Sequence, residues 1–215
     1  MQFPNLSGST QSKDSFSLYD YLGDQAWGLV LVHPGDFSPV CITEIGAAAR
    51  FKDEFSKRNV KLCAFSCCDV TSHKIWIDDI KATTGAHVEF PIFADVDRAY
   101  ANILGILDMT RNDKNTSLPL LLRAVYILYP GNDHRIAAVM IYPNATGRNF
   151  SEFFRVIDAL KLTSKYPVST PADWTQGDKV LLSSSLADSE ADKVFEKVSL
   201  ETRSNVGLTN LVCGK

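Results

Sequence analysis

The chain lacks several features that would assign it to a functional class at once. Its 215 residues carry 22 basic and 25 acidic side chains, so there is no basic excess of the kind that nucleic-acid binders show. No apolar run approaches the roughly 18 residues that a membrane-spanning helix needs, which predicts no membrane span. Residues 1–14 are polar and have no apolar core of a signal peptide, so we expect a cytoplasmic protein.

Cysteines are few and unpaired in the sequence. The five cysteines, at positions 41, 63, 67, 68 and 213, are an odd number without Cys-x-x-Cys spacing. This pattern argues against a disulfide framework and against a zinc site, and it favours reduced thiols in a reducing compartment. A thiol–disulfide oxidoreductase is also disfavoured, because that chemistry usually requires a second cysteine three residues from the first.

The surroundings of Cys41 indicate a reactive thiol. An apolar run at 28–32 leads into a proline-containing turn, and an apolar stripe of helical spacing then joins Cys41 to Phe55 through Ile45, Ala48 and Phe51. This order predicts a strand, a turn and a helix with Cys41 in its first turn. Free N–H groups and the helix dipole favour an anion at that position, and the thiolate is the reactive form of cysteine. Cys41 is therefore the most promising chemical centre of the chain.

The remaining elements alternate in type along the chain. We predict strands at 59–67, 90–94, 124–129 and 136–141, the last two forming a β-hairpin around the turn at 130–133. Helices are predicted at 71–83, capped by Thr71 or Ser72, and at 96–104 and 150–160. Within the strand at 59–67, Cys63 and Cys67 would share one face and be buried. The pattern predicts an α/β protein with a thioredoxin-like fold, in which helices flank a mixed central sheet.

The sequence changes character after the helix at 150–160. Prolines at 167 and 171 break the helical pattern, and only a short helix near 189–198 is expected beyond them. We expect a thioredoxin-like domain at 1–165 and a small C-terminal domain or dimerisation arm at 166–215. The second has too few apolar residues for a core of its own, so we expect it to pack on the main domain or on a partner subunit. The second arrangement predicts a homodimer in which each arm reaches across to the partner.

At this point the residues resemble the peroxiredoxin family. Pro34, Ser38 and Cys41 match its Pro-x-x-x-Thr/Ser-x-x-Cys signature. The chain is similar to the one-cysteine subfamily from about residue 20 to about residue 200, through His33, Phe37, the Pro39–Cys41 and Thr43–Glu44 segments, Arg58–Leu62, Leu107–Asp108, Arg123, Tyr142–Pro143, Thr146–Phe150, and Thr170–Trp174 with Gly177–Asp178.

The resemblance implies an enzyme that reduces hydrogen peroxide and organic hydroperoxides through a Cys41 sulfenic acid, without metal or other cofactor. An external thiol reductant, from the glutathione or thioredoxin system, would resolve that intermediate. The resemblance also implies roles for the neighbours: Arg123 pairs with the thiolate and Arg148 is a second site arginine. In the same reading Pro34 shields the sulfenate, Ser38 places its hydroxyl beside the sulfur, and His33 and Glu44 line the pocket or orient the arginines.

Other interpretations remain at this stage. Cys41 alone could be an inert buried thiol, Arg123 and Arg148 could be surface or ion-pair arginines, and Ser38 could be a turn residue. His33 could be a structural histidine, and Glu44 could simply favour the first turn of its helix. Cys213 could act as a resolving cysteine, which would make this a two-cysteine peroxiredoxin. The sulfenate could also serve a redox-sensing binding or chaperone module.

Overall fold

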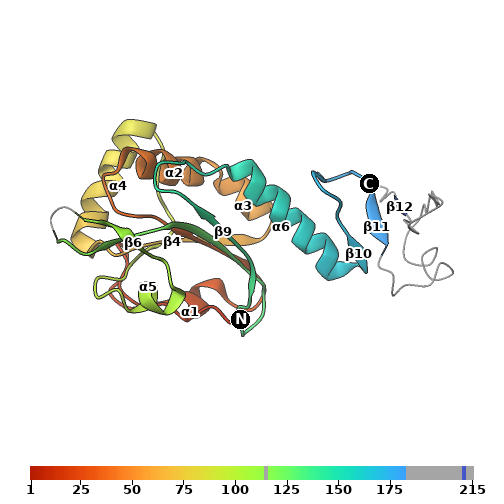
Figure 1. Cartoon of the computed structure of the whole chain (residues 1–215), viewed down its shortest axis with the longest axis horizontal. Helices are drawn as coiled ribbons and strands as arrows, with labels where there is room; N and C mark the ends of the chain where they lie inside the picture. Colours follow the sequence, from red (N-terminus) through yellow and green to blue (C-terminus); the bar gives the residue numbers. More distant parts are fainter. Residues whose placement is uncertain (114–115, 183–209, 212–215) are drawn as a thin grey trace. The chain divides into compact units, whose positions relative to one another are not determined.

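A five-stranded mixed sheet forms the centre of the first part of the chain (Figure 1). The structure, a computed structural model, describes residues 1–113 and 116–182 and the backbone of 210–211. It divides into two units, Met1–Phe150 and Ser151–Lys215. The helices and strands of the first unit are β1 (Ser7–Gly8), β2 (Phe16–Ser17), α1 (Leu18–Leu22), β3 (Trp27–Val32), α2 (Pro39–Arg50), α3 (Lys52–Lys57), β4 (Val60–Ser66), α4 (Val70–Thr84), β5 (Ile92–Ala94), α5 (Ala99–Leu104), β6 (Leu107–Asn112), β7 (Pro119–Leu121), β8 (Arg123–Leu128) and β9 (Ile136–Tyr142).

The strand order is β5-β4-β3-β8-β9. Strands β3, β4 and β5 run parallel, whereas β8 pairs antiparallel with both β3 and β9. Figure 1 shows α2, α3 and α4 on one face of the sheet and α1 and α5 on the other. This is the mixed sheet of a thioredoxin-like fold, and the predicted hairpin of β8 and β9 is confirmed.

Successive side chains of β3 point to opposite faces of the sheet, and both faces are buried. Val30 and Val32 belong to the core cluster on one face, together with Cys63 and Phe65 of β4. Leu29 and Leu31 are equally buried and alternate with those residues, so they point to the opposite face. A strand that is apolar at every position is typical of a sheet covered on both faces. The Cys41 helix, α2, lies in one of those covering layers.

The packing of α2 against α4 requires a glycine. A Cβ added to Gly46 would lie 2.7 Å from the side chain of Thr84, the last residue of α4. Gly46 therefore lets the two helices approach each other closely. The apolar stripe predicted from Cys41 to Phe55 extends over two helices, because α2 ends before Phe51 and α3 begins after it. Phe51 is partly exposed and stacks on the ring of Phe150, with the ring centroids 5.6 Å apart.

Several predicted boundaries are wrong for physical reasons. Helix α4 begins one residue earlier than expected, because the Asp69 side chain caps it by accepting a hydrogen bond from the Ser72 N–H at 2.7 Å. Helix α5 begins at Ala99 instead of 96, because the Asp95 carboxylate first holds a turn through the N–H groups of Tyr100 and Ala101.

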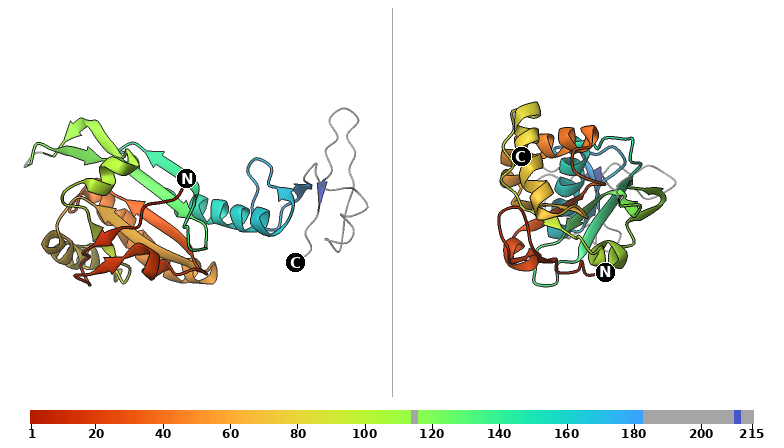
Figure 2. Two further views of the ribbon diagram at one scale, coloured as in Figure 1. Left: turned by 90° about the horizontal axis from the view of Figure 1, so that it is seen from below. Right: turned by 90° about the vertical axis from the view of Figure 1, so that its left-hand side faces the viewer.

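Two further differences concern strands. Strand β4 ends at Ser66, so Cys67 does not share a strand face with Cys63; it is partly buried and packs against the core. The β6–β7 hairpin was not predicted, and Figure 2 shows it extending beyond the central sheet. Its exposed residues, including Met109 and Leu118, lack the apolar alternation that marks a strand buried on one face.

The second unit contains most of α6 (Phe150–Lys165), which confirms the helix predicted at 150–160, and three short strands. These are β10 (Val168–Ser169), β11 (Val180–Leu182) and β12 (Asn210–Leu211), which form an antiparallel sheet. A small cluster packs Val168, Trp174 and Val180 against Leu162 and Tyr166. The helix expected near 189–198 and Cys213 lie outside the described residues. No helix among the residues described is long and apolar enough to cross a membrane.

Candidate functional site

Cys41 lies in the first turn of α2, beneath the turn that leads from β3. The helix begins with Pro39 at its first position, where the missing N–H of proline costs no intrahelical hydrogen bond. Ser38 is the N-cap residue, in an extended conformation with φ −69° and ψ 130°. The Cys41 side chain is completely buried. The local sequence therefore places a sheltered thiol at the positive end of a helix dipole.

Arg123, the first residue of β8, contacts the Cys41 sulfur directly. Its Nη1 donates a hydrogen bond to Cys41 Sγ at 3.2 Å and another to Glu44 Oε2 at 2.8 Å. Its Nε donates to the backbone carbonyl of Asn144 at 2.8 Å. The arginine is itself buried, so these hydrogen bonds are shielded from water. Glu44 and the Asn144 carbonyl thus hold the guanidinium so that Nη1 also donates to the thiol.

Glu44 joins the two arginines of the site. It lies one turn after Cys41 on α2, and its buried carboxylate accepts hydrogen bonds from the Arg148 N–H and Nε at 3.0 Å each and from Arg148 Nη2 at 2.8 Å. Arg148 Nη1 also donates to the carbonyls of Val32 and Ala124, at the adjacent β3 and β8 strands. Such a network is the paired and hydrogen-bonded state that a buried charge requires.

The charges of this network do not cancel without the thiol. Arg123 and Arg148 contribute two positive charges, and Glu44 contributes one negative charge within hydrogen-bond distance of both. The three side chains therefore have a net charge of one positive unit. Arg123 is the member that contacts the Cys41 sulfur. A thiolate at Cys41 would bring the net charge of this buried group to zero.

The other predicted site residues lie around this network. The buried His33 donates through its backbone N–H to the Phe65 carbonyl, and its ring Nε2 lies 3.0 Å from Asp36 Oδ1. Pro34 is partly exposed in the turn between β3 and α2. Ser38 is in position to cap α2, but its side chain makes no capping hydrogen bond. The structure thus brings Cys41, Glu44, Arg123 and Arg148 into one network and leaves Pro34 and Ser38 in the turn above it.

Sequence reasoning missed two parts of the site. Asn144 holds Arg123 only through its backbone carbonyl, which no residue pattern reveals. Asp36 anchors His33, and its position three residues after that histidine was the one available signal. The partners of Asp36 on α4, Ser72 and His73, are 36 and 37 residues away in the chain.

The remaining described cysteines differ from Cys41 in their surroundings. All four cysteines of the described part are free thiols. Burial raises the pKa of Cys63 far above its ordinary value, that of Cys67 to about 12 and that of Cys68 to about 11. These three thiols stay protonated at neutral pH, so they are poor nucleophiles.

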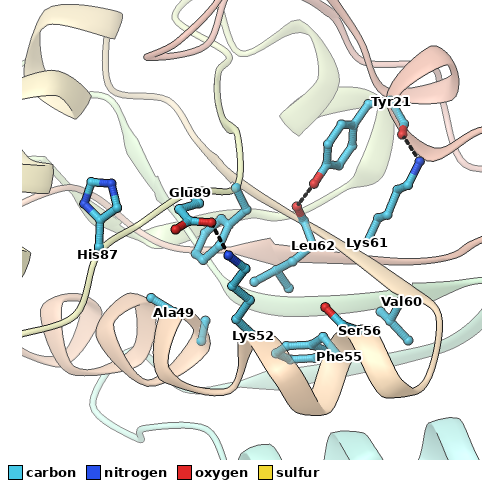
Figure 3. Close-up of a pocket in the computed structure, with 12 residues that line it drawn as sticks. Tyr21, Ala49, Lys52, Phe55, Ser56, Val60, Lys61, Leu62, His87 and Glu89 are labelled. Carbon is cyan, nitrogen blue, oxygen red and sulfur yellow. Dashed lines mark hydrogen bonds and ion pairs between the residues drawn. The ribbon is translucent and has the colours of Figure 1, made fainter.

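A separate cavity of about 230 Å³ lies away from this network, beside the C-terminal half of α2 (Figure 3). It is lined by Tyr21, Ala48, Ala49, Lys52, Phe55, Ser56, Val60, Lys61, Leu62, His87, Glu89 and Phe90. Lys52 and Glu89 form an ion pair at its mouth, and the Tyr21 hydroxyl donates to the Leu62 carbonyl. None of the predicted site residues lines it.

Comparisons with known proteins agree with each other. The AhpC/TSA family model matches residues 1–132, and the model of the C-terminal domain of 1-Cys peroxiredoxin matches residues 159–197. The chain is 44% identical to Peroxiredoxin-6 of Gallus gallus over 198 residues, which is 90% of this chain and 86% of that protein. It is 38% identical to 1-Cys peroxiredoxin of Dirofilaria immitis over 211 residues, covering 92% of this chain and 88% of that one.

Solved structures give the same result. A cysteine-to-serine mutant of the peroxiredoxin 6 of Arenicola marina has a TM-score of 0.90 and 37% identity, over 99% of this chain and 96% of that one. Yeast mitochondrial 1-Cys peroxiredoxin, whose structure is described as the basis of its thiol resolving mechanism via glutathione/thioredoxin systems, has a TM-score of 0.85 and 38% identity. That match covers 99% of this chain and 97% of the yeast chain.

Proposed function

This chain belongs to the peroxiredoxin family, in its one-cysteine group, and we propose that Cys41 is the thiol that reduces its peroxide substrate. The protein is a thiol-dependent peroxidase, an oxidoreductase. The observation that carries the assignment to Cys41 is the hydrogen bond from Arg123 Nη1 to its sulfur at 3.2 Å. No other described cysteine makes such a contact with a guanidinium.

The reaction uses the charge arrangement of the site. The Cys41 thiolate attacks one oxygen of the peroxide, the O–O bond breaks, and the other oxygen leaves as an alkoxide or hydroxide that takes up a proton. The sulfur is oxidised to a sulfenic acid while the peroxide is reduced to an alcohol or to water. Arg123 and Arg148 stabilise negative charge as it moves from the sulfur to the departing oxygen, which is the role that fixed donors play in a buried site.

The flanking residues have supporting roles in this proposal. Glu44 holds both guanidinium groups in place through its two carboxylate oxygens. The partly exposed Ser38 supplies a hydroxyl that donates to the bound peroxide, and Pro34 limits the access of water to the sulfenate. His33 lines the pocket wall.

The sulfenic acid is resolved by an outside thiol. One thiol attacks the sulfur and releases water to give a mixed disulfide, and a second thiol releases the reduced Cys41 together with an oxidised disulfide. Glutathione or a thioredoxin would supply these thiols, since the yeast relative is resolved via glutathione/thioredoxin systems. Free cysteines suit a reducing compartment, and we place the protein in the cytoplasm.

We also propose that the enzyme is a homodimer in which the segment 166–215 serves as a C-terminal arm. The described part of the second unit has a core of few residues, chiefly Val168, Trp174 and Val180, which is small for independent stability. Sedimentation of the full chain and of a version ending at residue 165 tests this assembly. A full-length monomer would contradict the dimer.

The test of the function is a mass measurement on the intact protein. One equivalent of hydrogen peroxide is expected to add a single oxygen atom to the wild-type chain, trapped at Cys41 by a sulfenate-specific reagent. Cys41→Ser is expected to gain none and to consume no peroxide with dithiothreitol as reductant, because an alcohol is barely ionised at neutral pH. Peroxide turnover by Cys41→Ser would overturn the assignment.

A further inference from the structure

A buried carboxylate outside the arginine network ties the turn above Cys41 to a different helix. The Asp36 side chain is only 1% exposed, and both of its oxygens are occupied. Oδ1 lies 3.0 Å from His33 Nε2, whereas Oδ2 accepts from Ser72 Oγ and lies 2.7 Å from His73 Nδ1. The Asp36 backbone N–H donates to Cys68 Sγ at 3.3 Å. Asp36 is therefore fixed through both its side chain and its backbone.

These contacts connect three elements of the fold. His33 directly follows β3, Ser72 and His73 are in the first turn of α4, and Asp36 belongs to the turn that leads into α2. The next residue, Phe37, has a φ of 58°, in the left-handed region that non-glycine residues seldom adopt. Such a backbone conformation persists only where surrounding contacts hold it. The contacts of the preceding residue, Asp36, fix the backbone directly before Phe37.

The protonation state of the cluster follows from its contacts. Burial by itself would raise the pKa of Asp36, but the hydrogen bonds from His33 and His73 outweigh it and hold that pKa well below its usual range. Asp36 is therefore an anion that can only accept hydrogen bonds. It follows that His33 carries its proton on Nε2 and His73 carries one on Nδ1.

This arrangement selects one form of His33. Burial lowers the pKa of His33, and the charge of Arg148 also lowers it, so the imidazole is neutral at pH 7. With Nε2 protonated, Nδ1 holds a lone pair, and that buried atom has no hydrogen-bond partner among the described residues.

A metal centre is the other arrangement that two histidines, an aspartate and a cysteine suggest. Within the described part of the chain, no three side chains of these types are placed to hold a metal ion. Both Asp36 oxygens are already engaged by hydrogen-bond donors, one at Oδ1 and two at Oδ2. The cluster is organised around a carboxylate and its donors.

We propose that Asp36 is a positioning residue for the peroxidase reaction: it anchors the 34–38 turn to the first turn of α4 and sets His33 in the tautomer whose Nδ1 bears a lone pair instead of a proton. The inference rests on the proposed function of Cys41. Asp36 does not touch the sulfur; it determines where the turn above Cys41 lies and which hydrogen-bonding groups that turn presents.

The primary test compares Asp36→Asn with Asp69→Asn. Both replace an aspartate that contacts Ser72, but Asp69 is exposed and only caps α4. Asp36→Asn is expected to slow the bimolecular oxidation of Cys41 by hydrogen peroxide about 10- to 100-fold, the usual cost of a small misplacement of reacting groups. Asp69→Asn is expected to stay within about twofold of wild type, because it retains a capping side chain. Equal rates for the two variants overturn the proposal.

A spectroscopic measurement separates a positioning role of Asp36 from a loss of stability in the Asp36→Asn variant. Long-range proton–nitrogen NMR correlations on the wild-type protein are expected to show His33 protonated on Nε2 and His73 on Nδ1. An amide offers a single acceptor oxygen, so Asp36→Asn is expected to change at least one of these two signatures while Asp69→Asn changes neither. The opposite tautomers in the wild-type protein contradict the proposal.

A second pair of variants keeps the test valid if Asp36→Asn does not fold. His73→Asn keeps an N–H donor close to the position of Nδ1, whereas His73→Leu removes the donor and fills similar volume. Hydrogen peroxide is expected to oxidise Cys41 about tenfold faster in the asparagine variant than in the leucine variant. Equal rates count against the anchor. If wild-type Cys41 does not react with peroxide at all, the proposed function itself fails; if it reacts and only these comparisons fail, the failure concerns Asp36.

Discussion

Arg123 and Cys41 are 82 residues apart in the chain, yet Arg123 Nη1 donates a hydrogen bond to Cys41 Sγ at 3.2 Å inside the protein. The same nitrogen lies 2.8 Å from Glu44 Oε2, so the donor is oriented by a carboxylate of the helix that carries the thiol. This relationship couples the reactivity of Cys41 to the exact position of β8.

Replacing the other described cysteines separates reactivity from packing. Cys63→Ala leaves a small cavity in the core, because Cys63 is fully buried, and it is expected to lower the denaturation midpoint. The folded Cys63→Ala variant is expected to reduce peroxide at the wild-type rate. The reason is that the raised pKa of Cys63 keeps this thiol protonated and unreactive in the wild-type protein. Peroxide kinetics and urea denaturation on the same sample check both parts. A loss of rate without a loss of stability would assign Cys63 a direct role.

Arg123→Lys tests the directional donor. A lysine ammonium cannot span Cys41, Glu44 and the Asn144 carbonyl at once, so the donor to the sulfur is lost or displaced. We expect the second-order rate with peroxide to fall by about 100-fold or more, the range found when one donor of an anion-stabilising site is removed. Arg58→Lys is a matched control, because Arg58 pairs with Glu54 on a helix surface. A rate close to wild type for Arg123→Lys would rule out the pairing.

Glu44→Gln removes the negative charge between two buried guanidinium groups. Arg123 and Arg148 then repel each other without compensation, and breaking a buried ion pair in this way costs about 3–5 kcal/mol of unfolding free energy. Chemical denaturation measures the change. Glu54→Gln, which affects an ion pair on an exposed helix face, is expected to change stability little. If the two variants are equally stable, Glu44 does not hold the arginines as described.

His33 gives stability a pH dependence with a defined sign. Burial lowers the pKa of His33 in the folded protein, whereas the unfolded chain keeps a value of about 6.5. Below that pH the unfolded state binds one more proton, so the free energy of unfolding falls as pH falls, at up to about 1.4 kcal/mol per pH unit. Denaturation curves between pH 7 and 5 measure the slope. His33→Gln is expected to reduce this slope, whereas His87→Gln, at an exposed position, leaves it unchanged.

The resolving step is tested at Cys213, which lies outside the described residues. In a one-cysteine mechanism the oxidised Cys41 has no protein partner, so Cys213→Ser is expected to leave turnover with dithiothreitol unchanged. Peroxide-treated wild-type protein is expected to run as a monomer on non-reducing gels, and excess peroxide is expected to carry Cys41 on to sulfinic acid. A covalent dimer that disappears in Cys213→Ser would make this a two-cysteine enzyme.

The helix boundaries show where local sequence suffices and where it does not. The Cys41 helix begins as expected because Ser38 and Pro39 act within one turn of the chain. The predicted start of α4 is wrong, because three polar residues within four positions, Asp69, Thr71 and Ser72, can all cap a helix after this strand. Only the assembled structure shows that Asp69 supplies the cap while the Ser72 side chain turns to Asp36.

The sequence by itself determined the order of the five central strands and of the main helices between them, the thioredoxin-like class, the family and the position of Cys41 at a helix start. Those properties depend on periodicity, turn residues and a motif of eight positions, Pro34 to Cys41, all of which act over short distances. The tertiary structure alone decided that Glu44 joins Arg123 to Arg148 and that Asp36 joins His33 to His73. These contacts form only after strands and helices from distant parts of the chain have packed, because burial then removes water and forces each charge to find a partner.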